Sequence, residues 1–393
     1  MTFQHASADA GVGLAEPSLL ERARELGERV VRPTVADRDR TGRWDPELIA
    51  ELARPEPGPG LTGPLVPTAL GGGGLSARQT CDLLLGLGEG AGDPGLALAL
   101  AVHAVLATVP LRAFGTPRQR ERYLPRMASG EWLGAVSLSQ TQGAVLTPTV
   151  RARPAAPGMG GWVLSGESDL VAVAPVAHHF LVIAAHEDGG GRTAFLVDRD
   201  TPGLRIEEAG PAGMRTCPWG RLVLDGVLAR DEAVLGSAGG AAAEVEPLLA
   251  VLDWVFCSAP WVGLIRALVR EAAGYAVERR LFGRPLAHSQ SARLTLADLA
   301  VRGELAAGML YRAAERFDAG GRPSPRDAAA ARLFVATAAR EVAEGAARVS
   351  GPLALREGHL IERAHRDALF FAETGGGAEV LRPVIAASVL GLG

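Results

Sequence analysis

Histidine and glycine residues are the first candidates for chemistry in this sequence. Their spacing argues against a metal site and against a phosphate-binding loop. His178 and His179 are adjacent, and His186 follows a few positions later. Adjacent side chains on a strand point to opposite faces, and no carboxylate pattern completes a metal shell. We therefore interpret these histidines as residues at the entry to a strand. The run from Gly71 to Gly74 lacks the Lys-Ser/Thr pair of a phosphate-binding loop.

Thiols and hydroxyls give no clear nucleophile. The three cysteines, Cys81, Cys217 and Cys257, are far apart and odd in number, which fits neither a disulfide framework nor a metal cluster and suggests a reducing cytoplasm. Neither Ser165, Ser350 nor Cys257 lies in a nucleophile elbow. The N-terminal segment has no charged and apolar regions of a secretory signal. We expect a cytoplasmic protein.

The composition is that of a globular enzyme-sized chain. Its 393 residues are 48% hydrophobic and 21% charged, and that length allows two or three domains. The net charge of -4, with Arg as the only strong base present, gives no reason to expect nucleic acid or an anionic membrane as a partner. The apolar run from Gly95 to Leu111 contains Pro110 and is short for a membrane span, so we predict a buried core helix.

Apolar periodicity divides the chain into helical, strand-rich and helical parts. An amphipathic helix begins near Ser18 and is predicted to end at Pro33. After Trp132, short β-like runs alternate with turn signals, which suggests a compact antiparallel barrel or sandwich. The order lacks the β/α alternation of a dinucleotide-binding sheet. Further helices are expected at 76–90, 96–114, 117–128, 248–281, 292–317, 325–349 and 378–390.

Four runs of sequence resemble one known family when they are taken together and in order. They are RYLPRMASGEWLGAVSLSQ, FLVDRDTPGLRI with LVLDGVLARDEAVLG, YAVERRLFGRPLAHSQ and EGHLIERAHRDALFF. Their order resembles that of the acyl-CoA dehydrogenases. The resemblance implies an α+β, mostly α fold. We expect an N-terminal helical domain over 1–132, a small antiparallel β-barrel domain over 133–238 and a C-terminal four-helix bundle over 239–393.

The resemblance also implies a flavin, FAD, between the β-domain and the C-terminal bundle of a homodimer or homotetramer. Arg279, Phe282 and Gln290 match the family segment that meets the pyrophosphate and adenine end of the cofactor of a neighbouring subunit. Arg offers a planar fork for phosphate oxygens, and Phe can cover an aromatic face. The alternative is that Arg279 and Arg280 merely complement the dipole of an exposed helix C-terminus.

The catalytic base of the family is missing from its usual place. In these enzymes a carboxylate takes the α-proton of a thioester while the flavin takes the β-hydride. Counting from the Arg366-Asp367 pair, the usual Glu position falls on Gly375. Asp253 matches the helix from which some members draw the base, and Glu373 could slide into place. The alternatives without a catalytic role are that Asp253 is an ordinary helix carboxylate and that Glu373 is a solvated charge in a loop.

Several residues that contact the flavin in the family are also replaced in this sequence. Ser139 keeps a hydroxyl where a Thr would bond the ring. The Trp-Ile-Thr motif that stacks on the ring reads Leu170-Val171-Ala172, and Pro352 replaces a glycine of a late cofactor motif. The pattern therefore leaves two possibilities open: weak flavin binding, or a pocket used for another reaction.

We expect an acyl-CoA dehydrogenase-like flavin oxidoreductase that desaturates an acyl thioester. Its late helix looks most like relatives that act on carrier-protein thioesters in polyketide or peptide biosynthesis, so the substrate would be carried by CoA or an acyl carrier protein in secondary metabolism. One alternative is a flavin-independent enzyme of elimination, cyclisation or isomerisation. Another is a non-catalytic subunit of a hetero-oligomer.

Overall fold

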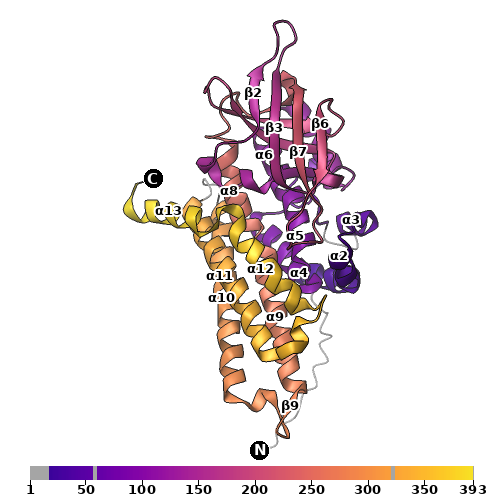
Figure 1. The fold of residues 1–393 in the computed structure, drawn as a ribbon, viewed down its shortest axis with the longest axis vertical. Coiled ribbons are helices and arrows are strands. Elements are labelled where there is room, and N and C mark those ends of the chain that lie inside the picture. The colour runs from indigo at the N-terminus through magenta and orange to yellow at the C-terminus, as the bar shows by residue number, and fades with distance from the viewer. Residues whose placement is uncertain (1–16, 56–59, 320–323, 393) are drawn as a thin grey trace, which may run out of the picture.

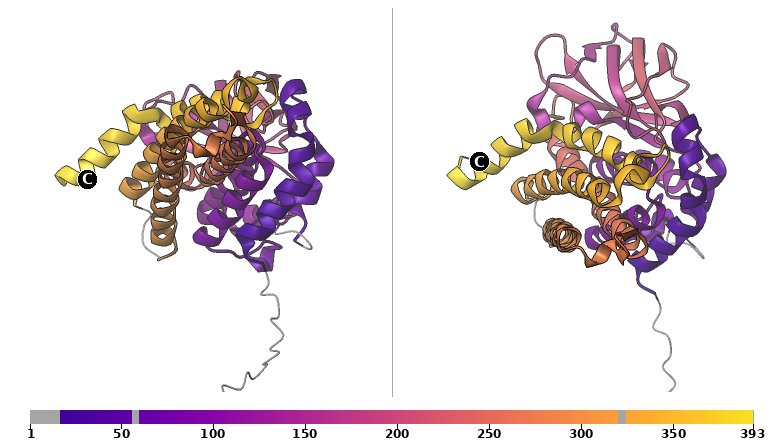
Figure 2. Two further views of the ribbon diagram at one scale, coloured as in Figure 1. Left: turned by 90° about the horizontal axis from the view of Figure 1, so that it is seen from below. Right: turned by 60° about the horizontal axis from the view of Figure 1, so that its bottom comes forward.

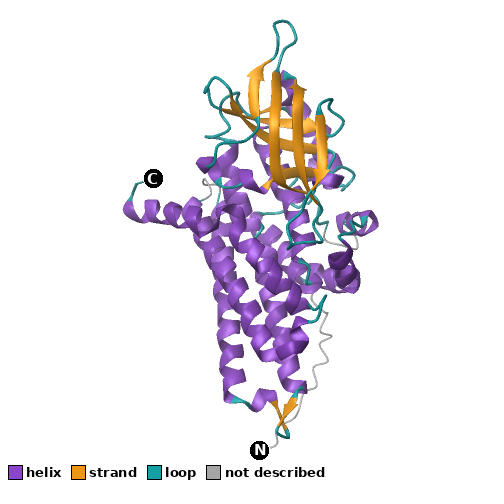
Figure 3. Ribbon diagram, viewed as in Figure 1, coloured by secondary structure: helices purple, strands orange, loops and turns teal. Residues whose placement is uncertain are grey.

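Helices form the first and last parts of the described chain and a sheet forms its middle, as expected from the sequence. The computed structural model describes residues 17–55, 60–319 and 324–392. The sheet lies at one end of the elongated molecule, and the helices extend away from it (Figures 1 and 3). This arrangement is the helical–β–helical fold predicted above.

The N-terminal helices begin at residues suited to cap them. Ser76 and Thr116 each form a reciprocal capping box, with Gln79 and Gln119 respectively, which satisfies backbone N–H groups at the helix start. The helices of this part are α1 Leu19–Leu26, α2 Val35–Thr41, α3 Pro46–Ala53, α4 Ala77–Ala91, α5 Pro94–Ala101, α6 Thr108–Phe114 and α7 Pro117–Ala128.

The prediction that helix ends at Pro33 was wrong. The chain passes from α1 through a π-helical segment, Gly27–Val31, and a 3₁₀ turn, Arg32–Thr34, into α2. Pro33 lies in the first turn of a new helical segment, where its missing N–H costs nothing. The helix instead stops at Gly42, which has a left-handed φ of 66°.

The apolar run predicted as a core helix is buried. The stretch Pro94–Phe114 comprises α5, a π-helical segment and α6, and it is long and apolar enough to span a membrane by composition alone. It is nevertheless 100% buried within the protein. Asp93 caps its start by accepting a hydrogen bond from the backbone N–H of Leu96 at 3.0 Å.

The middle of the chain is one sheet in the order β6-β7-β3-β1-β4-β5-β8, with β2 beside β3 and β4. Most neighbours are antiparallel, but β4 runs parallel to β1 and β2. The β2–β3 hairpin lies between β1 and β4 in sequence, which brings β4 back in the direction of β1. The strands are β1 Gly134–Ser137, β2 Arg151–Pro154, β3 Trp162–Ala172, β4 His179–His186, β5 Arg192–Asp198, β6 Leu204–Glu208, β7 Trp219–Ala229 and β8 Val234–Leu235.

The C-terminal part is a bundle in which α11 contacts α9, α10 and α12. The single long helix expected over 248–281 is two helices, α8 and α9, separated at Cys257 and Ser258. Pro260, in the first turn of α9, is the local reason for the break. The elements are α8 Val245–Phe256, α9 Ala259–Glu278, β9 Arg280–Leu281, β10 Arg284–Pro285, α10 Gln290–Asp318, α11 Pro325–Ser350, α12 Leu360–Glu373 and α13 Gly377–Leu390.

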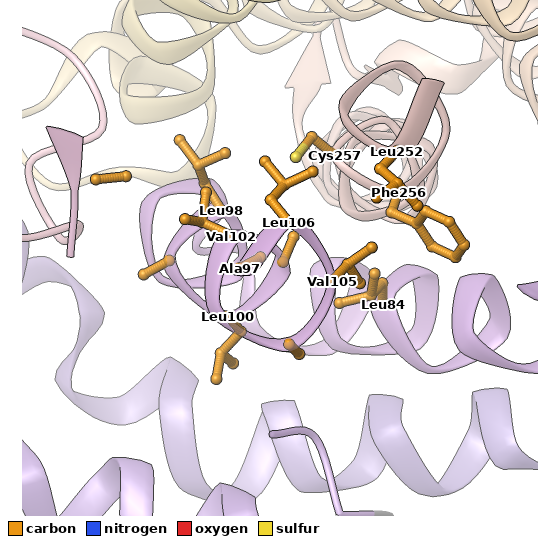
Figure 4. Close-up of a cluster of buried hydrophobic side chains, with 14 of the residues drawn as sticks. Leu84, Ala97, Leu98, Leu100, Val102, Val105, Leu106, Leu252, Phe256 and Cys257 are labelled. Carbon is orange, nitrogen blue, oxygen red and sulfur yellow. The ribbon is translucent and has the colours of Figure 1, made fainter. Parts of the chain in front are cut away.

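Helix α8 is fixed by the core that joins the N-terminal and C-terminal parts. Its residues Leu252 and Phe256, and Cys257 directly after it, pack beside Val105 and Leu106 of the buried segment between α5 and α6 (Figure 4). Each such side chain stabilises the fold by about 1.5–3 kcal/mol when fully buried. A residue on α8 is therefore held on a rigid support.

The last helix, α13, leaves the bundle. It contacts α11 and α12 near its start, and its C-terminal half projects away from the body (Figure 2). Val389, Leu390 and Leu392 at this end are exposed.

Candidate active site

Asp253 is a buried carboxylate at the junction of the sheet and the C-terminal helices. Its side chain on α8 is only 3% exposed. Thr141, in the turn that follows β1, donates a hydrogen bond from Oγ1 to Asp253 Oδ2 at 2.7 Å. Thr141 is itself fully buried. A buried charge is tolerated only where such partners compensate for lost hydration.

A buried arginine supplies the second partner. Arg332 Nη1 on α11 lies 4.0 Å from Asp253 Oδ1. Its other terminal nitrogen, Nη2, donates to the carbonyl oxygens of Phe371 and Thr374, each at 2.9 Å, and the guanidinium lies over the Phe371 ring at 3.7 Å. Burial lowers the pKa of Arg332, and the nearby Asp253 opposes that shift. Arg332 Nη1 has no hydrogen-bond partner among the described residues.

Gly375 lies directly against the Asp253 carboxylate. Its backbone has φ +70°, and a Cβ at this position would come within 2.7 Å of Asp253 Oδ2 and 3.2 Å of Arg332 Nη2. L-residues rarely adopt this conformation. A side chain at 375 and the observed position of Asp253 therefore exclude each other.

Neighbouring groups fix this arrangement. Trp254 Nε1 donates to the carbonyl oxygen of Gly375 at 2.8 Å, so α8 holds the Gly375 turn as well as Asp253. Cys257 lies one turn further along the helix. Burial raises the pKa of the Cys257 thiol well above its usual value, and Asp253 raises it further. Cys257 is therefore a neutral thiol, unsuited to act as a nucleophile.

Glu373 occupies a different environment. It is the last residue of α12 and is exposed. Its Oε2 lies near Gly377, on the side of the loop that also carries Glu379. The structure thus places one predicted base candidate, Asp253, in the buried junction and leaves the other at the surface.

Ser139 lies in the same turn as Thr141, with its side chain half-buried. Its hydroxyl is 2.7 Å from that of Ser137. Ser139 also lines a small cavity of about 90 Å³ together with Glu246. The neighbouring strand β3 ends with buried Val171 and Ala172, which offer neither an aromatic ring nor a hydroxyl.

Arg279, by contrast, lines a large pocket of about 800 Å³ between α9, α10 and α11. Among the described residues, its guanidinium has no hydrogen-bond or ion-pair partner. Ser289, Ser291 and Ala292, at the start of α10, line the same pocket. The first turn of α10 has no acidic residue and no side-chain cap, so its N–H groups are available to an anion.

The other two predicted cofactor contacts are near this pocket and at the surface. Phe282 is completely exposed at the tip of the β9–β10 hairpin and has φ +51°. Gln290, the first residue of α10, is exposed as well.

The predicted residues therefore fall into two groups at opposite ends of α9. Asp253 is on α8 and Ser139 in the turn after β1, whereas Arg279, Phe282 and Gln290 lie between the end of α9 and the start of α10. Figure 1 shows α8 beside the sheet and β9 at the far end of the bundle. The 20 residues of α9 correspond to about 30 Å of helix. The two groups are thus separated by about the length of this helix.

Three buried residues at this junction were missed in the sequence analysis: Thr141, Arg332 and Glu246. Arg332 interrupts an apolar helical run, AAAARLFVATAA, which is a signal that could have marked a buried charge. Glu246, in the first turn of α8, is paired with Arg192 at 2.9 Å, and burial raises its pKa. Thr141 carries no comparable sequence signal.

Metal chemistry finds no support in the described parts of the chain. No group of three or more His, Cys, Asp or Glu side chains there could hold a metal ion. His179 is buried with both ring nitrogens unpaired, and burial lowers its pKa to about 3.

Comparison with known proteins gives matches over nearly the whole chain. Family models match residues 15–131 as the acyl-CoA dehydrogenase N-terminal domain, 141–227 as its middle domain and 255–390 as its C-terminal domain. The chain is 31% identical to benzylmalonyl-CoA dehydrogenase of Aromatoleum aromaticum, over 93% of this chain and 95% of that protein.

Two further proteins are similar over most of their length. L-prolyl-(peptidyl-carrier protein) dehydrogenase of Serratia sp. is 28% identical, over 77% of this chain and 78% of that protein. The solved structure of butyryl-CoA dehydrogenase from Megasphaera elsdenii is 27% identical with a TM-score of 0.87, covering 95% of this chain and 97% of that one.

Proposed function

The chain belongs to the acyl-CoA dehydrogenase family, and on that premise we propose that it is a flavin-dependent oxidoreductase that desaturates an acyl thioester. The observation that carries the proposal is the position of Asp253. Its carboxylate fills the space beside Gly375, where the sequence resemblance places the base of the family.

The far end of the bundle suits the phosphate end of FAD. Arg279 brings a free guanidinium to a pocket of about 800 Å³, and the uncapped start of α10 faces the same pocket. Guanidinium groups and helix N-termini both bind phosphate oxygens. Phe282 and Gln290 would complete this contact, and all three residues would serve the cofactor of a second copy of the chain.

Fewer polar and aromatic groups are available to contact the flavin ring. Ser139 offers one hydroxyl, and the end of β3 offers only aliphatic surface from Leu170 to Ala172. We therefore expect FAD to bind more through its phosphates than through its ring. When bound, FAD supplies a two-electron acceptor for the hydride from the β-carbon.

The residues of this chain would carry out the proton chemistry. Asp253 accepts the α-proton of the thioester, which leaves electron density on the carbonyl oxygen as the double bond forms. Arg332 lies beside the Asp253 carboxyl group, where its positive charge offsets part of the cost of burying a negative one. The buried position of Asp253 also excludes water, which would otherwise compete as a hydrogen-bond partner.

The substrate would be an acyl group on CoA or on a carrier protein. Relatives named for each kind of substrate match the chain, so both kinds of thioester are candidates. By the same resemblance we propose a cytoplasmic homodimer or homotetramer that acts in secondary metabolism, such as polyketide or peptide biosynthesis.

FAD binding to the full-length protein tests the proposal. We expect purified protein to take up FAD and its absorbance to bleach anaerobically with acyl-CoA or acyl-carrier-protein thioesters. Arg279→Ala should weaken FAD binding at least tenfold. Arg280→Ala is the matched control, because its guanidinium donates instead to Gly283 O at 3.4 Å. Colourless protein that cannot be reconstituted with FAD would contradict the proposal.

The loss of ring contacts favours one second candidate. A flavin-independent elimination, cyclisation or isomerisation would need Asp253 but no aromatic or hydroxyl group at Leu170 and Ala172. Turnover without FAD that disappears in Asp253→Asn would support this candidate. Copurification with a flavin-bearing homologue would instead indicate a subunit of a hetero-oligomer.

A further inference from the structure

The hydroxyl of Thr141 has two acceptors. Its Oγ1 lies 2.7 Å from Asp253 Oδ2 and 2.9 Å from the carbonyl oxygen of Leu138. A hydroxyl carries one proton, so it can donate to only one of them at a time. Its lone pairs can also accept a hydrogen bond. The choice between the two acceptors therefore depends on whether Asp253 is charged.

We infer that Thr141 is a positioning residue for Asp253, because it can hold the carboxyl group both before and after that group takes up a proton. With Asp253 ionised, Thr141 donates to Oδ2. With Asp253 protonated at Oδ2, the carboxylic acid donates to Thr141 Oγ1, whose own proton turns to Leu138 O. The inference rests on the proposed role of Asp253 as the base.

The Thr141–Asp253 hydrogen bond can change direction, whereas the other polar neighbours of Asp253 are fixed. Arg332 is fixed by carbonyl oxygens at the end of α12 and by stacking on Phe371. Its nearest approach to Asp253 is 4.0 Å, which is longer than a hydrogen bond. Cys257, the other titratable neighbour, remains a neutral thiol as argued above. Thr141 is thus the hydroxyl donor to Asp253, and the other side-chain hydrogen-bond neighbour of Asp253 is the weakly donating Cys257 thiol.

The bond also joins two parts of the fold. Thr141 follows β1 of the sheet, and Asp253 lies on α8 of the helical part. Loss of the hydroxyl would free the carboxylate to turn toward Arg332. The base would then be displaced from the space beside Gly375, and proton transfer depends steeply on such placement. Thioester binding itself would be affected less.

Two substitutions separate positioning from packing. Thr141→Val keeps the shape and removes the hydroxyl, whereas Thr141→Ser keeps the hydroxyl. We expect the rate of flavin bleaching by butyryl-CoA or 3-phenylpropanoyl-CoA to fall at least tenfold in Thr141→Val and to stay within threefold in Thr141→Ser. The apparent Kd of the thioester should stay within threefold in both. Thr108→Val, at a buried helical threonine bonded to Ala104 O, is the packing control.

Infrared difference spectra test the bond without turnover. Bands of the Asp253 carboxylate are those absent from Asp253→Asn. They should shift in Thr141→Val and be restored in Thr141→Ser. Unchanged bands and an unchanged rate in Thr141→Val would overturn the inference while the proposed function stood. Full activity in Asp253→Asn would overturn the proposed function instead, and the infrared bands would still report whether the bond exists.

Discussion

At the scale of single residues, the position of Asp253 depends on the absence of a side chain at Gly375. The sequence resemblance could identify both positions separately, but the contact between them depends on how α8 meets the turn after α12. The clash that a Cβ at 375 would make with Asp253 Oδ2 explains why the usual position of the family base is a glycine here. The proposed base on α8 requires that space to be empty.

Gly375→Ala should therefore destabilise the protein and disturb the site. The left-handed backbone alone costs about 2 kcal/mol for an L-residue, and the contact of 2.7 Å with Asp253 adds to this cost. Chemical denaturation measures the loss. Gly274→Ala is the control, because this helical glycine has nothing within 4 Å of the added Cβ. It should gain about 0.5–1 kcal/mol. Equal stabilities for the two variants would contradict the account.

Residue types alone could not have identified Thr141, and they mark Arg332 only as a charge within an apolar helical run. Both act through contacts between elements that are distant in sequence, and neither a threonine in a turn nor an arginine in a helix indicates such a contact by itself. Asp253 was predicted because it matched a position in a known family. The assignment of Asp253 or Glu373 as the base stays a prediction, although only Asp253 lies in the buried junction.

At the scale of elements, a buried carboxylate joins α12 to the loop before β7. Asp367 Oδ1 accepts a hydrogen bond from the backbone N–H of Met214 at 2.7 Å and lies 3.3 Å from Arg366 Nε. Met214 has φ +55°, so this bond holds a strained turn. Burial raises the pKa of Asp367 to about 6, and the Met214 bond and Arg366 only partly oppose the shift.

This raised pKa predicts how stability depends on pH. Between about pH 4 and pH 6 the folded protein binds the Asp367 proton more tightly than the unfolded chain does. The contribution of Asp367 to the free energy of unfolding should therefore fall as pH rises through this window, by about 3 kcal/mol. Asp367→Asn should remove that slope in denaturation curves taken across the window. Asp225→Asn, at an exposed residue, should keep it. A wild-type slope in Asp367→Asn would refute the prediction.

Element boundaries could be predicted where local signals are strong. The expected limits of α7 agree with the structure, and those of α11 and α13 lie within a residue of it, because Pro and capping residues mark where these helices begin or end. Pro33 misled the prediction because proline is as acceptable in a first helical turn as after a last one. The β1–β4 parallel pairing could not be read from strand patterns, which do not specify partners.

At the scale of the whole molecule, the proposed site is incomplete in one chain. The predicted phosphate contacts and the proposed base lie at opposite ends of α9, so we propose that a second copy of the chain completes the site. Helix α10 has an exposed apolar face suited to such contact, with Leu294, Val301 and Leu305 at helical spacing.

Val301→Glu should weaken self-association and FAD binding together. A charge in the centre of an apolar interface loses its hydration without gaining a partner. Sedimentation velocity should show a shift toward monomer, with FAD released in the same fractions. Met159→Glu, at an exposed apolar residue in the β2–β3 connection, is the matched control and should remain assembled. Monomers that retain FAD would contradict the two-chain cofactor site.

The central claim is that Asp253 is the base of a flavin-dependent desaturation. Anaerobic stopped-flow bleaching of FAD-loaded protein by an acyl thioester measures it most directly. Asp253→Asn should bind FAD normally and bleach at least 100-fold more slowly, which is the scale of general-base catalysis. Glu373→Gln, the matched carboxylate control, should bleach within threefold of the wild-type rate. Wild-type bleaching in Asp253→Asn, or its loss in Glu373→Gln alone, would contradict the account.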